Sequence, residues 1–101
     1  MGRAYRIDYS RAAIDHLRFL TARQRRMVLD AVDRQLTYQP DVPTPNRKLM
    51  ESNPLAVWEL RIDNLRVYYD IEDEPEPVVV IRAVGVKERN IVRIGGEEVD
   101  L

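Results

Sequence analysis

The sequence predicts an α+β domain in which an N-terminal strand and a helical hairpin pack on one face of a mainly antiparallel sheet, in the order β-α-α-β-β-β. Three observations support this prediction. Apolar residues recur at helical spacing through residues 11–38, they alternate with polar residues through 58–71, and a nearly continuous apolar run follows at 78–86. With 101 residues, positions 1–101 are expected to form one domain around one core.

The first elements are a strand and two helices. Residues 5–9 alternate as a strand, and Ser10 can then cap a helix over residues 11–20. Thr21 can cap a second helix that ends near Tyr38. The expected buried stripes are Ala13, Ile14, Leu17 and Leu20 on the first helix, and Val28, Leu29, Val32 and Leu36 on the second.

Four prolines punctuate the segment that follows the helices, at positions 40, 43, 45 and 54. Because proline lacks a backbone N–H and restricts the residue before it, residues 40–54 are expected to form an exposed connection without regular structure. Arg47 and Lys48 lie in this connection.

The segment WELRIDNLRVYYDI at residues 58–71 reads as two half-buried strands joined by a tight turn. Asp63 and Asn64 tolerate positive φ, so we expect a type I′ turn that pairs Arg61 with Arg66. Like charges that face each other on a sheet destabilise it by a few tenths to about 1 kcal/mol. An anion bound between the two arginines would account for this arrangement, and so would Glu59, whose carboxylate could sit between them as a surface ion cluster.

The remaining residues predict a central strand and a short C-terminal region. The apolar run at 78–86 suits a strand covered on both faces. Lys87 and Arg89 follow it and could lie on the same open face as Arg61 and Arg66. A short apolar patch at 91–94, a Gly95-Gly96 turn and an acidic tail complete the chain.

Composition excludes several kinds of chemistry. The chain has no cysteine and one histidine, so disulfides, thiolate zinc sites and cysteine nucleophiles are ruled out, and neither a metal nor a cofactor is expected. His16 falls on the polar side of the first helix and reads as an ordinary surface residue. No apolar run reaches the about 18 residues of a membrane span, and the N-terminus lacks the apolar core of a signal peptide, so a cytoplasmic soluble protein is expected.

Charge is distributed unevenly along the chain, although the net charge is −1. Residues 1–50 carry ten basic and five acidic side chains, whereas residues 51–101 carry six basic and twelve acidic ones. Fourteen of the sixteen basic residues are arginine, whose planar guanidinium suits bidentate contact with phosphate. The basic residues are therefore free to form a patch for an anionic partner.

Three segments together resemble the RelE/ParE superfamily of bacterial type II toxins: YRIDYSRAAIDHLRFL, WELRIDNLRVYYDI and VVVIRAVGVKERN. The similarity covers nearly the whole chain and is nearer to the RelE branch. That branch implies a ribosome-dependent endoribonuclease that cuts mRNA, represses translation, and is neutralised by a cognate antitoxin protein. DNA would be met only indirectly, through the antitoxin. The ParE branch implies inhibition of DNA gyrase instead.

The resemblance also implies roles for individual residues. Arg66 matches the phosphate-contacting arginine of the third strand, Arg61 stands at the position of a family lysine, and Lys87 takes the place of an arginine that stabilises the transition state. Glu59 occupies another lysine position, where it could act as general base for the RNA 2′-OH or as a counter-ion. The candidate RNA-binding residues are Arg89, Arg93, Tyr68, Lys48 and Arg47.

Two of these residues depart from the family or admit a second interpretation. Arg93 stands where RelE-type enzymes have a tyrosine, so the usual aromatic acid/base or stacking partner is missing. Tyr68 shares the face of Arg61 and Arg66 and could stack on a base or donate a proton, or it could be an unexceptional surface tyrosine. The alternative to an endoribonuclease is accordingly a gyrase-inhibiting or catalytically inactive binding module of the same fold.

Overall fold

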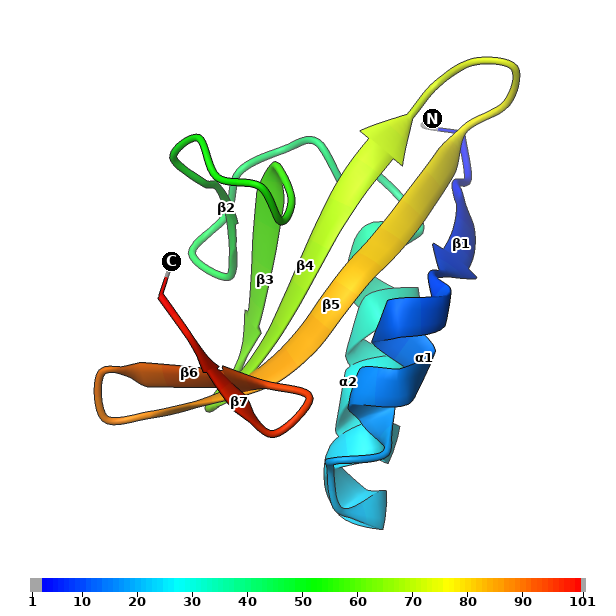
Figure 1. The fold of residues 1–101 in the computed structure, drawn as a ribbon. Coiled ribbons are helices and arrows are strands. Elements are labelled where there is room, and N and C mark those ends of the chain that lie inside the picture. Colours follow the sequence, from blue (N-terminus) through cyan, green and yellow to red (C-terminus); the bar gives the residue numbers. More distant parts are fainter. Residues whose placement is uncertain (1–2, 101) are drawn as a thin grey trace.

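The computed structural model describes residues 3–100 and confirms the α+β prediction, with two helices on one face of a sheet (Figure 1). The helices are α1 (Arg11–Leu17) and α2 (Ala22–Leu36). The strands of the described residues are β1 (Arg6–Tyr9), β2 (Arg47–Leu49), β3 (Trp58–Ile62), β4 (Leu65–Glu72), β5 (Val78–Glu88), β6 (Ile91–Ile94) and β7 (Glu97–Val99).

Strand β5 is central to the sheet, because it pairs with β4, β1 and β6. The order β2-β3-β4-β5-β6-β7 is antiparallel throughout, and β1 pairs with β5 in parallel. One edge of β5 is therefore shared, by β1 at residues 78–81 and by β6 at residues 85–88. The gap between them is closed by α1 and its N-cap: Ser10 donates its N–H to the Ile81 carbonyl, and Nδ1 of His16, in the last turn of α1, accepts from the Val84 N–H at 3.3 Å.

This hydrogen bond corrects the prediction for His16. The side chain is half-buried and satisfies a backbone donor of the central strand, so it is a structural residue and not an ordinary surface one. Burial lowers the pKa of His16 below its usual value, partly offset by the negative charge of Asp15. The neutral imidazole is the form that can accept the Val84 proton.

Both helices begin where the sequence predicts. The Ser10 hydroxyl accepts from the Ala13 N–H, and Thr21 and Gln24 form a reciprocal capping box. Helix α1 ends three residues earlier than predicted, because residues 18–20 form a tight turn that brings the chain to the extended Thr21 cap. Ile14 and Leu29 were predicted to be buried but are exposed, since each lies at the flank of the stripe that meets the sheet.

The main core lies between the helices and the sheet. It contains the inward residues of α2 and of β3, β4 and β5, with Trp58 and Tyr69 stacked at a ring separation of 6.0 Å. Trp58 is thus a core residue, as its alternation predicts. The Tyr69 hydroxyl donates to the Pro40 carbonyl at 2.8 Å and so anchors the proline-rich connection to the sheet.

The proline-rich connection is not wholly irregular, because residues 47–49 form β2 and pair with β3 in the register Lys48 with Glu59. The prediction for this segment was wrong because residues 46–53 contain no proline. The prolines therefore bracket a strand instead of interrupting one.

The β3–β4 hairpin has the predicted register, with Arg61 opposite Arg66 and Ile62 opposite Leu65. Its turn differs from the type I′ prediction: Asp63 has a φ of 52°, but Asn64 is not among the residues with positive φ. A type I′ turn needs positive φ at both central residues. The pairing survives because a two-residue loop fixes the register in either turn type.

The C-terminal residues form a hairpin that folds across the sheet. Gly95 and Gly96 both have positive φ, at 61° and 80°, and reverse the chain between β6 and β7. The predicted acidic tail is therefore partly a strand, because this turn pairs residues 97–99 with β6. A Cβ on Gly85 would lie 2.6 Å from the Arg93 carbonyl oxygen, so glycine permits β6 to approach β5 this closely.

Candidate active site

The sheet face opposite the helices carries the polar side chains of β3 and β4. Glu59 and Arg61 alternate with core residues on β3, and Arg66 and Tyr68 do so on β4. On β5, Lys87 continues this face beyond Gly85, which is the cross-strand partner of Arg66. The antiparallel register thus brings residues from three strands to one surface.

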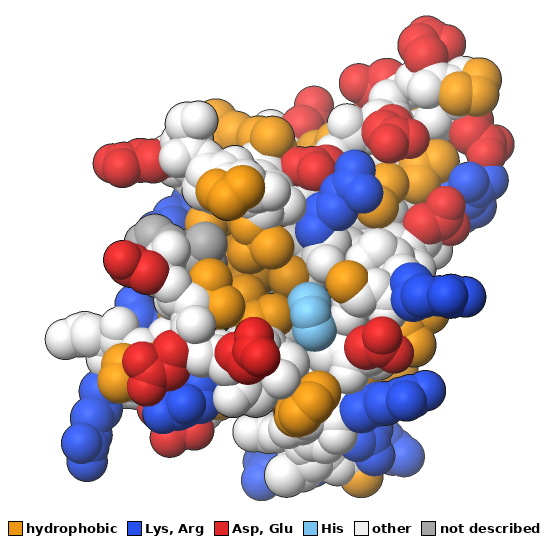
Figure 2. All heavy atoms as spheres, in the orientation of Figure 1, with side chains coloured by type: hydrophobic (Ala, Val, Ile, Leu, Met, Phe, Trp, Pro, Cys, Tyr) orange, Lys and Arg blue, Asp and Glu red, His pale blue; other side chains and the backbone are white. Residues whose placement is uncertain are grey.

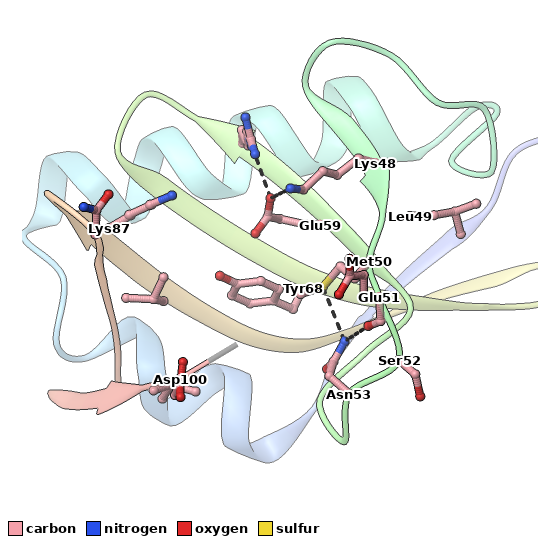
Figure 3. A pocket seen from close by; sticks show the side chains of 14 residues that line it. Lys48, Leu49, Met50, Glu51, Ser52, Asn53, Glu59, Tyr68, Lys87 and Asp100 are labelled. Carbon is pink, nitrogen blue, oxygen red and sulfur yellow. Dashed lines mark hydrogen bonds and ion pairs between the residues drawn. The ribbon is translucent and has the colours of Figure 1, made fainter.

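A hollow of about 510 Å³ opens on this face between β3, β5 and the β6–β7 hairpin (Figure 3). Residues 48–53 form one wall, and Val92, Val99 and Asp100 contribute the opposite one. Its size is within the range of small-ligand sites. The candidate site residues that line it are Lys48, Glu59, Arg61, Tyr68 and Lys87.

Glu59 is the one acidic side chain on the floor of the hollow, and its residue is only 8% exposed. Its Oε1 atom lies 3.1 Å from Arg61 Nε and 3.7 Å from Lys48 Nζ (Figure 3). The carboxylate therefore sits between Arg61 and Lys48, and not between Arg61 and Arg66 as the surface-cluster interpretation expected. Both cations are about half exposed, so water screens these ion pairs.

Arg66 is held differently from Arg61, although the two face each other across the strands. Its Nη1 donates to the carbonyls of Asp63 and Leu65, at 2.8 Å each, and Arg66 does not line the hollow. The guanidinium is thus folded toward the β3–β4 turn at the rim. No carboxylate within residues 3–100 forms an ion pair with it.

Lys87 points into the hollow from the end of β5 (Figure 3). Its backbone N–H donates to the Asn64 carbonyl at 2.7 Å, which ties this position to the β3–β4 turn. No ion pair to Lys87 is present within residues 3–100, so its ammonium group remains free to meet an anion. Arg89 lies beyond it in the β5–β6 turn, with a φ of 58°, and does not line the hollow.

Tyr68 has the predicted orientation but is fully buried, with 0% exposure. It packs with Ala56, Ala83 and Ile94 in a second, smaller core cluster beneath the β6–β7 hairpin. Its hydroxyl has no hydrogen-bond partner among the described residues. Burial raises the pKa of Tyr68 well above its usual value, and the charge of Glu59 raises it further. In this arrangement its ring is not open to a stacking base.

Two of the nine candidate residues lie elsewhere. Arg47 extends to the helical side of the sheet, where it donates to the Gln35 carbonyl of α2. Arg93 alternates with Val92 and therefore points away from the hollow, and its Nη2 lies 3.3 Å from Glu98 Oε1. The hollow thus gathers five candidates, Arg66 and Arg89 lie near its rim, and Arg47 and Arg93 are separate from it.

Sequence reasoning did not anticipate the walls of the hollow. Asn53 shapes one wall, because its Oδ1 accepts from the N–H groups of Leu55 and Ala56 and its Nδ2 donates to the Glu51 carbonyl. The available signals were an asparagine next to Pro54 and the Gly95-Gly96 pair. Neither indicates what its segment packs against, so neither locates a wall.

Neither a cluster of metal-ligand side chains nor a membrane-spanning helix is present within residues 3–100. No three His, Asp or Glu side chains lie close enough together to hold a metal ion. No helix in this part of the chain is long and apolar enough to cross a membrane.

The fold recurs in a toxin–antitoxin complex. No protein-family model and no curated protein matches the sequence. Among solved structures, the chain is similar to a chain of the RelBE2 toxin–antitoxin complex of Mycobacterium tuberculosis, with a TM-score of 0.71 and 23% sequence identity. The similarity covers 87% of this chain and 94% of that chain. It confirms the fold that the resemblance to RelE-type toxins implies.

Proposed function

We propose that this chain is the toxin of a type II toxin–antitoxin system: a single-domain, metal-independent endoribonuclease that cuts ribosome-bound mRNA in the cytoplasm and so represses translation. The observation that carries this proposal is the convergence of Lys48, Arg61 and Lys87 around one hollow, with Arg66 at its rim. The fold shared with a toxin–antitoxin complex supports it.

The chemistry begins with the RNA 2′-OH. Glu59 removes its proton as general base, the 2′ oxygen bonds to the adjacent phosphorus, and the bond to the 5′ oxygen breaks. Negative charge accumulates on the phosphorane as this happens, and cations fixed around it lower the barrier. Lys87 has no carboxylate partner in residues 3–100 and can both stabilise that charge and give a proton to the leaving 5′ oxygen.

The partners of this activity are a cognate antitoxin protein, the ribosome and mRNA, and DNA is met only through the antitoxin. The surplus of positive charge in residues 1–50 supports an acidic segment of the antitoxin as one contact. The RNA contacts nearest the reaction come from Lys48 and Arg89, which lie in and beside the hollow. Arg47 and Arg93 have no part in this contact, because Arg47 is bound to the Gln35 carbonyl of α2 and Arg93 to Glu98.

One observation favours a second candidate, a gyrase-inhibiting or catalytically inactive binding module. Glu59 already forms ion pairs with Arg61 and Lys48, and Tyr68 has no exposed surface, so fewer groups are free for catalysis than in a fully open cationic site. A protein that only occupies its target needs no general base.

To decide between the two candidates, the protein is expressed in bacteria without an antitoxin, and protein synthesis, mRNA cleavage and plasmid supercoiling are measured in parallel. We expect translation to stop with cleaved mRNA and unchanged supercoiling. Arg66→Ala should abolish cleavage and leave thermal unfolding nearly unchanged, because removing the like charge opposite Arg61 offsets two solvated hydrogen bonds. Arg34→Ala, on the exposed side of α2, is the control. A change in supercoiling without mRNA cleavage would contradict the ribonuclease proposal.

A further inference from the structure

A second basic surface lies far from the hollow, at the turn between α1 and α2. Residues 16–29 contain no aspartate or glutamate and four arginines. We call Arg18, Arg23 and Arg26, with Phe19 between them, the hairpin tip; all four are exposed. The fourth arginine, Arg25, stabilises the turn itself, because its Nη1 donates to the Leu20 carbonyl at 2.7 Å.

The three tip arginines take part in no ion pair with any residue in 3–100. This distinguishes them from Arg3 and Arg6, which are also exposed but lie against Asp73 and against Asp8 and Glu76. Charges without an internal ion pair are available to an external anion. The tip is thus an unneutralised cationic surface on an otherwise mildly acidic protein.

Phe19 gives the tip an aromatic group that is held in place. Phe19 is 64% exposed to solvent. A Cβ on Gly96 would lie 3.0 Å from Phe19 Cε1, so the ring rests against the β6–β7 turn. An exposed ring on the same turn as exposed arginines is a combination that can stack on nucleic-acid bases while cations contact the backbone.

The fold separates this tip from the acidic β4–β5 connection. The α1–α2 turn lies at one end and the β4–β5 connection, with Asp73, Glu74 and Glu76, at the other (Figure 1). In the surface view, red side chains crowd the upper right and several blue ones lie over the helices below (Figure 2). The longest dimension of the molecule is 38 Å, so salt screens one end from the other.

Shape distinguishes between anionic partners. An amphipathic protein helix needs an apolar groove to receive its side chains. The tip is a projecting helical turn, and none of its residues lines the hollow over β3 and β5. A projecting group of arginines with one aromatic ring instead fits against the phosphate backbone of structured RNA, where guanidinium groups make paired contacts with phosphate oxygens.

We propose that the hairpin tip is a docking surface for structured RNA, separate from the hollow, and that it holds the protein to the ribosome through contacts independent of base sequence. This inference rests on the proposed ribosome-dependent function. It assigns the tip to binding and leaves the hollow to cleavage. Because the contacts are to phosphate, the affinity should depend strongly on salt.

The test compares two double variants that remove the same charge. Arg23→Gln/Arg26→Gln changes the tip, and Arg3→Gln/Arg6→Gln changes the ion-paired arginines at the acidic end. Both are made in the Arg66→Ala background, so that binding is measured without cleavage. Fluorescently labelled proteins are titrated with purified bacterial ribosomes, with a short RNA duplex and with poly-glutamate at several salt concentrations. Thermal unfolding verifies that each variant is folded.

For the tip variant we expect roughly tenfold weaker binding to both probes, and a salt slope smaller by roughly 1.5, as for two lost phosphate contacts. The control should bind as the parent does. Equal losses in both variants would overturn the proposal in favour of bulk charge, and so would unchanged binding in the tip variant. Unchanged ribosome binding together with lost binding to poly-glutamate would assign the tip to an acidic protein. If the unsubstituted protein, with Arg66 intact, does not cleave mRNA, the proposed function is contradicted, but the binding result for the tip is not.

Discussion

Replacing Glu59 by glutamine separates the two roles that its position allows. Glutamine keeps the shape of the side chain and one oxygen acceptor toward Arg61 but removes the charge. In the folded protein the carboxylate is nearly buried, and its Oε1 atom contacts Arg61 at 3.1 Å and Lys48 at 3.7 Å. The substitution therefore changes a base and two ion pairs with little change in packing.

The expected effect on stability is small. The cations are about half exposed, at 41% for Arg61 and 52% for Lys48, so each ion pair contributes about 0.2 to 1 kcal/mol. Losing both ion pairs would lower the free energy of unfolding by at most about 2 kcal/mol. Part of that loss is offset, because a neutral glutamine does not have the desolvation cost of a buried carboxylate. For a chain of this size, about 1 kcal/mol corresponds to roughly 4 to 8 °C in Tm.

The expected effect on cleavage is much larger. If Glu59 is the general base, Glu59→Gln should slow the cleavage step roughly 10²- to 10⁴-fold while ribosome binding is kept. The measurements are single-turnover cleavage of ribosome-bound mRNA, affinity for the ribosome, and thermal unfolding. Glu98→Gln is the matched control, because it removes a carboxylate that is also paired with an arginine but lies outside the hollow.

Two results would refute the reasoning. Full cleavage activity in Glu59→Gln, together with a slightly lower Tm, would make Glu59 a counter-ion only. A loss of cleavage that is matched by an equal loss of ribosome binding would mean that the charge organises the cations of the hollow and takes no proton from the 2′-OH.

Two further predictions concern the framework of the site. Gly85→Ala should lower the free energy of unfolding by about 1 to 3 kcal/mol, because its Cβ would lie 2.6 Å from a backbone oxygen of β6. RNA cleavage should also fall, because β6 contributes to a wall of the hollow and would move. A free energy of unfolding equal to that of the parent protein, measured by chemical denaturation, would contradict this prediction. For His16, burial lowers the folded-state pKa below the usual 6.5, so the unfolded chain binds the proton first. The contribution of His16 to stability should therefore be fully present above about pH 6.5 and be lost as the pH drops through the folded-state pKa. In His16→Gln, the denaturation midpoint should depend less on pH over this range.

Local sequence patterns were sufficient for much of the fold. Alternation through residues 58–71 determined which side chains of β3 and β4 face the helices, and the two-residue loop determined that Arg61 pairs with Arg66. Ser10 and Thr21 marked the helix starts. These features are predictable because each depends on neighbours a few residues apart, through hydrogen bonds and side-chain direction that the local backbone sets.

Other features depended on contacts between distant segments. The role of His16 arises because β1 and β6 leave a gap on one edge of β5, which no pattern around residue 16 reveals. Tyr68 is buried because the β6–β7 hairpin folds over it. In the same way β2 forms because an edge of β3 is available to residues that lie between prolines.

For the candidate site, the sequence by itself determined the residue types and, for Glu59, Arg61 and Arg66, the strand face, because strand alternation has a period of two. Lys87 is on that face only because an irregularity in the β4–β5 pairing shifts the alternation of β5 between Ile81 and Ala83. Only the tertiary structure decided which of them meet. Glu59 contacts Lys48 from β2 and not Arg66 from β4, and Arg66 turns toward the Asp63 carbonyl. Alternation fixes the side of the sheet on which a side chain lies, but its partner is set by the twist of the sheet and by the segments that pack against it.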